Sequence, residues 1–153
     1  MHLYLIRHAH AEDGTRDAIR PVSAKGQRQI RDIGRLLRKA EAVDAEEIWH
    51  SPLRRSVETA ALLAERLRLK VPLREVGGLK PQDDPHGVLR RLRSTEIPVA
   101  IVGHDPQLSA LASLLVTGTA EPATFVLKKC AVLRLDSNGA GWCVRWQISP
   151  ELL

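Results

Sequence analysis

The apolar run IPVAIVGH, residues 97–104, constrains the fold more than any other stretch of this sequence. No polar residue alternates with its apolar ones, which is typical of a strand buried on both faces. Strands of that kind occur in parallel sheets that helices cover on both sides. The next segment, residues 105–116, has leucine and alanine at helical spacing, and we expect Asp105 to cap this helix and Pro106 to be its first residue. The two segments indicate a strand-and-helix unit of an α/β protein.

Strand-like and helix-like segments alternate along the rest of the chain as well. The predicted strands cover residues 2–7, 46–51 and 70–75. The predicted helices cover residues 23–40, 53–68 and 87–94. The third of these strands contains a proline, which favours an edge position in the sheet. The stretch SNGAG, residues 137–141, lies between two strand-like runs and predicts a C-terminal β-hairpin.

This order of elements predicts a three-layer α/β/α sandwich with a mostly parallel central sheet. No linker, internal repeat or low-complexity tract divides the 153 residues, so we predict a single domain over residues 1–153. Within the predicted helix at residues 53–68, the apolar spacing predicts one buried face, formed by Val57, Ala61, Ala64 and Leu67.

Two of the predicted strands are followed by a histidine. The run LYLIRH ends at His8, and the run VAIVGH ends at His104. Binding sites of open α/β sheets form outside the carboxyl ends of the strands. We therefore expect His8 and His104 to lie in one crevice, with Arg7 beside the first of them. The strand at residues 46–51 leads into SPLRRSVET, which brings Arg54 or Arg55 to the same edge.

Imidazole and guanidinium groups together suit phosphoryl transfer. The transferred group carries negative charge on three equatorial oxygens, which positioned cationic donors stabilise. Guanidinium groups bind such oxygens with two parallel hydrogen bonds. A neutral histidine nitrogen can attack the phosphorus and hold it covalently. The pattern therefore predicts a phosphate pocket with a histidine nucleophile, and the start of the helix after His104 adds positive potential.

Three motifs in this order, LIRHA, SPLRRSVETA and VGHDP, resemble those of the histidine phosphatase superfamily. The opening RHAxAE, the segment IRPVSAKG and the terminal WQISPELL are similar to its SixA-type branch of phosphohistidine phosphatases. The resemblance covers essentially the whole chain. It implies the phosphoglycerate-mutase-like fold of that family and a metal-independent phosphatase that needs no cofactor.

The resemblance also implies roles for five residues. His8 matches the phosphorylated nucleophile, and Arg7 matches the first phosphate-binding arginine. The family's next arginine stands four residues after the motif serine, which selects Arg55. His104 matches the second histidine of the pocket. Arg20, within IRPVS, matches an arginine characteristic of the SixA-type branch and is expected to reach the phosphate.

The sequence departs from the family pattern at two points. The residue after the nucleophile is Ala9, where the commonest opening has glycine. Larger relatives also supply a carboxylic general acid, for which the candidates here are Asp83, its neighbour Asp84, Glu12 and Asp13. A phosphohistidine substrate releases imidazole, which leaves readily once protonated. An enzyme for phosphohistidine can therefore work without a dedicated carboxylic acid, whereas an alcohol leaving group gains about 10²–10⁴-fold from one.

The chain is too short for the large lid insertions of sugar-phosphate relatives, so we expect an open, basic pocket. Such a pocket suits a phosphorylated histidine that protrudes from another protein. A phosphatase of small phosphate monoesters remains an alternative, as does a non-catalytic module that binds phosphoproteins or nucleic acid. The net charge of +5 favours anionic partners. Three Trp, one Tyr and one Phe offer few stacking platforms, and no reading motif is present, so we expect no specific nucleic-acid partner.

Other catalytic chemistries fit the sequence less well. His8 and His10 have the spacing of metal ligands, with Asp105 as an imaginable third, but no further cluster completes a site, so no metal is predicted. Cysteine-based phosphatases need a phosphate-cradling loop closed by an arginine, and none stands at the matching distance after Cys130 or Cys143.

We expect both cysteines to be buried free thiols within strands, as in a reducing compartment. No signal peptide and no apolar stretch of the ~20 residues needed to span a bilayer are present in the sequence. These observations favour a cytoplasmic protein without a membrane partner. The oligomeric state stays open at this point.

Overall fold

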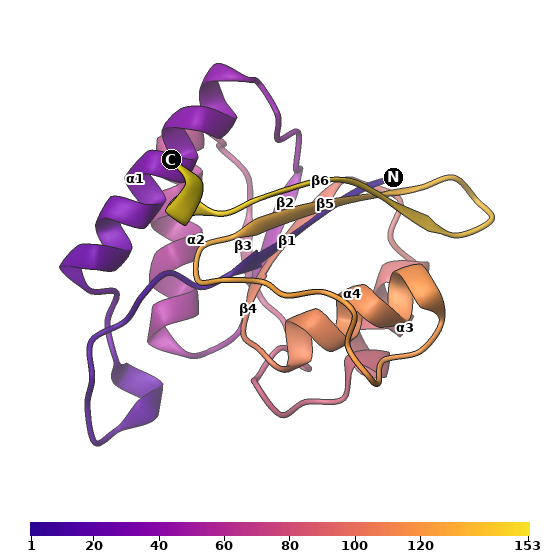
Figure 1. Ribbon diagram of the computed structural model, residues 1–153, viewed down its shortest axis with the longest axis horizontal. Coiled ribbons are helices and arrows are strands. Elements are labelled where there is room, and N and C mark those ends of the chain that lie inside the picture. Colours follow the sequence, from indigo (N-terminus) through magenta and orange to yellow (C-terminus); the bar gives the residue numbers. More distant parts are fainter.

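Six strands form one central sheet in the computed structural model, which describes all 153 residues (Figure 1). The strands are β1 His2–Arg7, β2 Glu47–His50, β3 Leu73–Glu75, β4 Val99–Gly103, β5 Val132–Ser137 and β6 Trp142–Ile148. Their order across the sheet is β3-β2-β4-β1-β5-β6. The strands β1 to β4 are parallel, whereas β5 runs antiparallel to β1, and β6 runs antiparallel to β5. The predicted parallel sheet, edge strand and C-terminal hairpin are confirmed.

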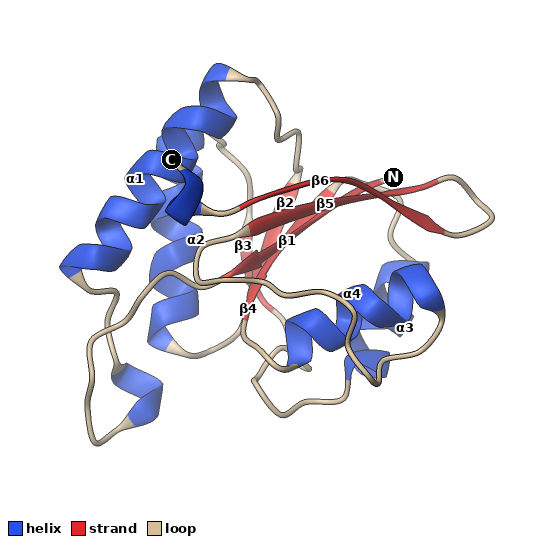
Figure 2. Cartoon of the chain, in the orientation of Figure 1, coloured by secondary structure: helices blue, strands red, loops and turns tan.

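Helices cover both faces of this sheet, as the secondary-structure colouring of Figure 2 shows. They are α1 Ala24–Lys39, α2 Arg54–Leu67, α3 Pro85–Arg93 and α4 Gln107–Thr117, with short 3-10 turns η1 Asp17–Ile19 and η2 Pro150–Leu152. Helices α1 and α2 pack together on one face, and α3 and α4 pack together on the other. The three-layer α/β/α prediction is therefore confirmed. None of these helices has the length and the apolar character that crossing a membrane requires.

The core consists of two clusters, one on each face of the sheet. Leu3 and Leu5 of β1 belong to the cluster that includes α4 residues, and Tyr4 and Ile6 belong to the cluster that includes α1 and α2 residues. Successive side chains of a strand point to opposite faces, so β1 contributes to both clusters. Burial of each such side chain stabilises the fold by about 1.5–3 kcal/mol. All five residues of β4 are buried, as its continuous apolar run predicts.

The start of α1 is bound to the loop that follows His8. The Ser23 side chain accepts a hydrogen bond from the Gly26 amide at 3.0 Å and so caps the helix. The Ser23 amide donates to the His10 carbonyl oxygen at 2.9 Å. A Cβ at Gly26 would collide with the His10 carbonyl oxygen and the Val22 side chain, so only glycine fits here. This contact joins the first turn of α1 to the residues after β1.

The predicted buried face of α2 is wrong at two of its four positions, whereas Ala64 is buried as predicted and Leu67 is half-buried against the core. Val57 is 37% exposed, and Ala61 is also exposed. The hydroxyl of Ser56 donates to the Val102 carbonyl oxygen at 2.7 Å, so polar residues occupy the buried side of the helix and mislead a reading by hydropathy. The buried residues of α2 are Arg55, Ser56, Thr59, Ala60, Leu63 and Ala64.

The predicted start of α4 is also wrong. The helix begins at Gln107, and Pro106 rather than Asp105 stands at the N-cap position. The Leu108 amide already donates to the His104 carbonyl oxygen at 2.8 Å. The Asp105 carboxylate therefore accepts from the next amide, that of Ser109, at 3.0 Å. The Asp105 carboxylate thus still binds an amide of the first turn of α4, although Asp105 stands one residue before the N-cap.

The two cysteines differ from each other. Cys130 is buried, and burial raises the pKa of its thiol to about 12, but it lies in a turn before β5 with φ of 62°. Cys143 is exposed on β6, because the hairpin's outer strand lies at the edge of the sheet. Both are free thiols, as predicted. The predictions that both are buried and that Cys130 belongs to a strand are wrong.

Candidate active site

The parallel pairing of β1 with β4 brings the two strand-end histidines together. Arg7 and Gly103 are register partners, so His8 and His104 leave the sheet side by side. Their ring centroids are 5.0 Å apart, and the residues are 6% and 1% exposed, respectively. The two strand-end histidines therefore lie close together, as expected.

The His8 ring is held in one tautomer. Its Nδ1 lies 2.7 Å from the Ala9 carbonyl oxygen, which can only accept, so Nδ1 carries the proton and donates. The lone pair is then on Nε2. The pKa of His8 is lowered to about 3, mainly by burial and also by the charges of Arg55 and Arg7 and by repulsion from a protonated His104, against an opposing effect of the hydrogen bond to Ala9. His8 is therefore neutral at pH 7 and carries an unprotonated nitrogen suited to nucleophilic attack.

The His104 ring is oriented by a serine that the sequence reasoning did not single out. Its Nε2 lies 2.5 Å from Ser51 Oγ, which also accepts from the Leu53 amide at 3.3 Å. The other nitrogen, Nδ1, is buried without a partner. Burial lowers the pKa of His104 to about 4, and the Arg55 charge acts in the same direction. Ser51 opens the motif SPLRR, and that position was the available signal for it.

Arg55 stands in the first turn of α2 and is only 5% exposed. Its Nη1 donates to the Asp17 carbonyl oxygen at 3.0 Å, and its Nη2 lies 3.3 Å from the Asp17 carboxylate. The neighbouring Arg54 is exposed and pairs with Glu58 at 3.3 Å. The position in the sequence allowed either Arg54 or Arg55 to face the histidines. In the structure it is Arg55 that is buried and whose charge acts on both of them.

Arg7 approaches the same pair of rings from the end of β1. Its Nη1 donates to the Leu127 carbonyl oxygen at 2.9 Å and lies 3.8 Å from the Asp105 carboxylate. Its Nε is buried without a partner. The charge of Arg7 lowers the pKa of both His8 and His104. Arg7 is therefore available to bind an anion there.

A carboxylate absent from the predicted site, Asp17, lies between two of the predicted arginines. Arg20 Nη1 donates to it at 3.0 Å, and Arg55 contacts its other oxygen. Partial burial raises the pKa of Asp17, but the hydrogen bonds and charges of Arg20 and Arg55 lower it by more, so the net shift is downward. Asp17 thus stays ionised and is poorly suited to donate a proton. No sequence motif marked it.

The candidate general acid Asp83 is engaged elsewhere. Its carboxylate accepts from the Lys80 amide at 2.9 Å, in the loop before α3. It lines a separate hollow, of about 340 Å³, which includes Pro106 and Gln107. No hydrogen bond or ion pair joins Asp83 to His8 or His104. Its neighbour and the two other candidates are bound or exposed as well: Asp84 caps α3, and Glu12 and Asp13 are exposed.

The loop that follows β1 is bound to α2 through one hydroxyl. The Ala9 amide donates to Thr59 Oγ1 at 3.0 Å, and the same hydroxyl donates to the Arg55 carbonyl oxygen at 2.7 Å. The His8 amide donates to the Gly103 carbonyl oxygen at 2.9 Å. The backbone around His8 is thereby held against both β4 and the helix that carries Arg55.

Comparison with known proteins agrees with this geometry. Residues 3–80 match the family model described as Histidine phosphatase superfamily (branch 1). The chain therefore belongs to the histidine phosphatase superfamily, and its enzyme class is that of a phosphatase. A search of curated protein sequences found no match.

Several solved structures share the fold. The protein histidine phosphatase SixA complexed with tungstate superposes with a TM-score of 0.86 at 23% identity, covering 99% of both chains. The alpha-ribazole phosphatase from Shigella flexneri has a TM-score of 0.81 at 20% identity, covering 98% of this chain and 97% of its own. A mutant phosphoserine phosphatase from Entamoeba histolytica, in complex with phosphoserine, has a TM-score of 0.71 at 17% identity. The match covers 99% of this chain and 98% of the phosphatase.

The two buried histidines predict a loss of stability in acid. A histidine of the unfolded chain has a pKa near 6.5. In the folded protein the pKa is about 3 for His8 and about 4 for His104, so both rings stay neutral at lower pH. Between these values the unfolded state binds more protons. The stabilising contribution is thus complete above pH 6.5 and is lost as the pH falls. At pH 5 the loss is about 2 kcal/mol for each histidine.

Urea unfolding at pH 7 and at pH 5 measures this effect. The variant His8→Gln/His104→Gln carries no imidazole at either position, and its unfolding free energy is expected to fall by about 4 kcal/mol less than that of the wild type. Equal falls in the two proteins would contradict the prediction.

Proposed function

We propose that this phosphatase removes the phosphoryl group from a phosphorylated histidine of another protein, through a covalent phosphohistidine on His8. The observation that carries the proposal is the neutral His8 ring, with Nδ1 bound to the Ala9 carbonyl and Nε2 free, 5.0 Å from the His104 ring. In this proposal residues 1–153 act as one domain, without a metal or another cofactor.

In the first step His8 Nε2 attacks the phosphorus. The bond between His8 Nε2 and phosphorus forms as the bond between phosphorus and the substrate imidazole breaks. The electron pair of the breaking bond stays on the substrate imidazole. That imidazole is protonated on its other nitrogen in the substrate, so it leaves as a neutral ring. The hydrogen bond from Nδ1 to the Ala9 carbonyl supports the positive charge that develops on the His8 ring.

In the second step water attacks the phosphorus and the Nε2–P bond breaks. The electron pair returns to Nε2, and the product is dihydrogen phosphate, which retains both protons of the water. Arg7, Arg55 and Arg20 bind the equatorial oxygens, with Arg55 and Arg20 exchanging their contacts to Asp17 for the phosphoryl group. His104, oriented by Ser51, donates a hydrogen bond to a phosphoryl oxygen.

The acids around the pocket support a P–N rather than a P–O substrate. An ester releases an alkoxide, which needs a proton in the transition state. Asp17 is held as a carboxylate by two guanidinium groups, and Asp83 is bound to the Lys80 amide. Neither is placed to protonate a leaving group. The fold's likeness to SixA favours phosphohistidine, and its likeness to the alpha-ribazole and phosphoserine phosphatases favours small phosphate monoesters as the alternative.

The test offers the wild-type protein two substrates in the presence of EDTA. One is a carrier protein phosphorylated on histidine, and the other is an aryl phosphate. We expect loss of the protein-bound phosphate with a kcat/KM much higher than that for the ester. Turnover of the ester alone would replace the proposal by a small-molecule phosphatase, and loss of all activity in EDTA would contradict the metal-independent mechanism.

A further inference from the structure

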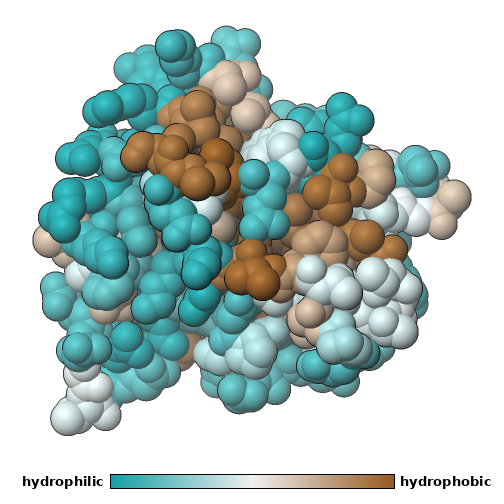
Figure 3. Space-filling model, viewed as in Figure 1, coloured by the Kyte–Doolittle hydropathy of each residue, from teal (hydrophilic) through white to brown (hydrophobic).

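A hollow of about 590 Å³ begins at Arg7 and extends along α1 to η2. Side chains of β1, α1, the segment before β5 and the C-terminal turn line it, and we call it the basic groove. Five of its lining residues are cationic: Arg7, Lys25, Arg28, Lys128 and Lys129. The outer edge of the molecule along α1 is largely hydrophilic in Figure 3, and apolar side chains gather near the C-terminal turn and towards the centre. Because Arg7 belongs to both, the groove is continuous with the candidate active site.

The positive charge of the basic groove is largely uncompensated. Lys25, Arg28, Lys128 and Lys129 take part in none of the molecule's ion pairs. Burial lowers the pKa of Lys129, and the charges of Arg7, Arg20, Lys25 and Arg55 lower it further. Like charges that depress one another's pKa create a field that attracts an anion.

Two residues that line the groove each contain a buried polar atom without a hydrogen-bond partner. Ser149, which lines the groove, is 8% exposed, and its Oγ has no hydrogen-bond partner. Arg7 Nε is likewise buried and unpartnered. Such groups are costly to bury unless a ligand satisfies them. A guanidinium N–H only donates, and a serine hydroxyl can donate as well as accept, so an acceptor would satisfy both atoms.

We propose that the basic groove binds aspartate or glutamate side chains that flank the phosphohistidine of the substrate protein. The inference rests on the proposed function, because it requires a phosphoryl group at His8 with its own polypeptide beside it. An occupant attached to that residue enters the groove at Arg7 and extends along Lys25 and Arg28. Carboxylates are acceptors that suit these cations and the Ser149 hydroxyl.

The lining favours an acidic peptide over nucleic acid. No phenylalanine, tyrosine or tryptophan lines the groove, so the ring of His10 is the one aromatic surface on which a base could stack. Asp32 and Glu151 interrupt the row of cations. A continuous phosphate backbone would meet these carboxylates unfavourably, whereas acidic side chains at intervals can avoid them.

The test compares two short synthetic peptides that carry a non-hydrolysable phosphonate analogue of phosphohistidine. Glutamates flank the analogue in one peptide, and glutamines replace them in the other. Calorimetric titration of the wild-type protein at physiological salt is expected to give a dissociation constant about tenfold lower for the acidic peptide, which corresponds to ~1.4 kcal/mol.

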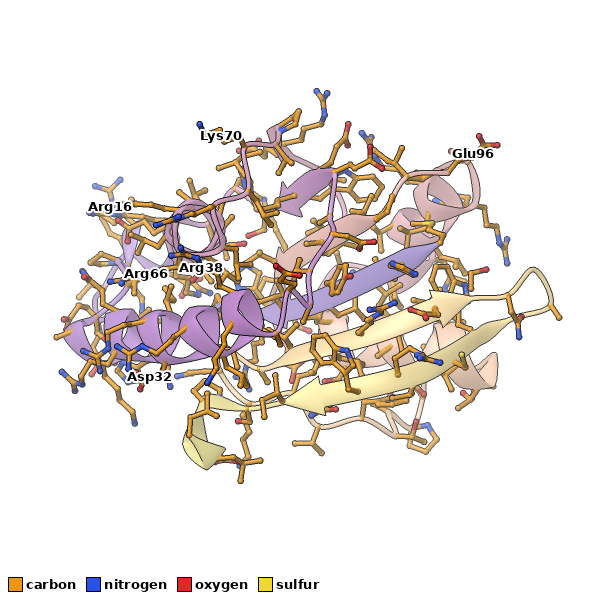
Figure 4. The ribbon with its side chains drawn as sticks, turned by 90° about the horizontal axis from the view of Figure 1, so that it is seen from above. Arg16, Asp32, Arg38, Arg66, Lys70 and Glu96 are labelled. Carbon is orange, nitrogen blue, oxygen red and sulfur yellow. The ribbon has the colours of Figure 1, made fainter.

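Two charge-matched variants locate the effect. Lys25→Ala/Arg28→Ala removes two cations of the groove, and the ratio of the two dissociation constants is expected to fall to about one. Arg35→Ala/Arg38→Ala removes two exposed cations of the same helix, which line a different hollow with Arg66, and it should keep the wild-type ratio. Figure 4 shows Asp32, which lines the basic groove, and Arg38 on opposite sides of α1.

Each other outcome overturns the inference in a recognisable way. Equal affinity of the wild type for the two peptides would overturn the inference alone, since the phosphohistidine analogue would still bind. Binding of neither peptide would overturn it together with the proposed function. A loss of preference in both variants would show a general charge effect. A single-stranded oligonucleotide that displaces the acidic peptide at a lower concentration would assign the groove to nucleic acid instead.

Discussion

The variant His8→Asn is expected to lower kcat/KM for a phosphohistidine protein by about 10⁴-fold or more. The reason is that the proposed reaction forms a bond to His8 Nε2, and removal of a nucleophile that acts as part of a unit costs nearly all of the catalysis. Asparagine can retain a hydrogen bond to the Ala9 carbonyl from its amide nitrogen, so the loop should stay in place. The residual rate then reports binding and charge stabilisation alone.

Two controls accompany this variant. Rapid acid quench with radiolabelled substrate should trap phosphate on the wild-type protein and none on His8→Asn. The matched variant His86→Asn removes an exposed histidine that pairs with Asp84, and it should keep wild-type kinetics. Turnover by a folded His8→Asn protein within tenfold of the wild type would exclude His8 as the nucleophile.

The variant Arg55→Ala is expected to lower kcat/KM by about 10²–10³-fold, the usual cost of removing one charge-stabilising donor. Arg55 is buried at the start of α2 with its guanidinium near both imidazole rings. Its planar fork matches two phosphoryl oxygens, and lysine offers only a point charge. Arg55→Lys should therefore recover only part of the lost rate.

The neighbouring residue provides the comparison for this variant. Arg54→Ala removes the same charge from an exposed position that pairs with Glu58, and kcat/KM should change by no more than about twofold. Thermal unfolding of each variant separates lost catalysis from lost stability, because Arg55 is buried and Arg54 is not. Equal losses in the two variants would contradict the assignment of the phosphate contact to Arg55.

Much of the fold could be predicted from hydropathy, because strands buried on both faces and amphipathic helices leave clear periods in the sequence. The run at residues 99–103 and the paired strand ends at His8 and His104 are of this kind. The errors arise where polar residues are buried. Ser56 turns its hydroxyl inward to the Val102 carbonyl, and a scale of hydrophobicity assigns such a residue to the surface.

The site was predictable where residues follow strand ends and less so where contacts come from loops. Ser51 reaches His104 across 53 positions of sequence, and Asp17 reaches Arg55 across 38. Both contacts depend on how the chain returns to the sheet edge, so hydropathy does not reveal them, and only Ser51 stands in a motif. Asp83 stood in a loop rich in proline and acid, but the loop folds back on its own Lys80 amide.

The close contact of Gly26 with the His10 carbonyl fixes the position of α1 relative to His8. Since no side chain fits between this residue and the His10 carbonyl, the first turn of α1 cannot shift along the loop that follows His8. Lys25 stands directly beside Gly26, and its distance from His8 is set by that contact. On the proposed docking, the protein would measure the number of residues between a phosphorylated histidine and the nearest acidic side chain. Substrates would then be told apart by spacing as well as by charge.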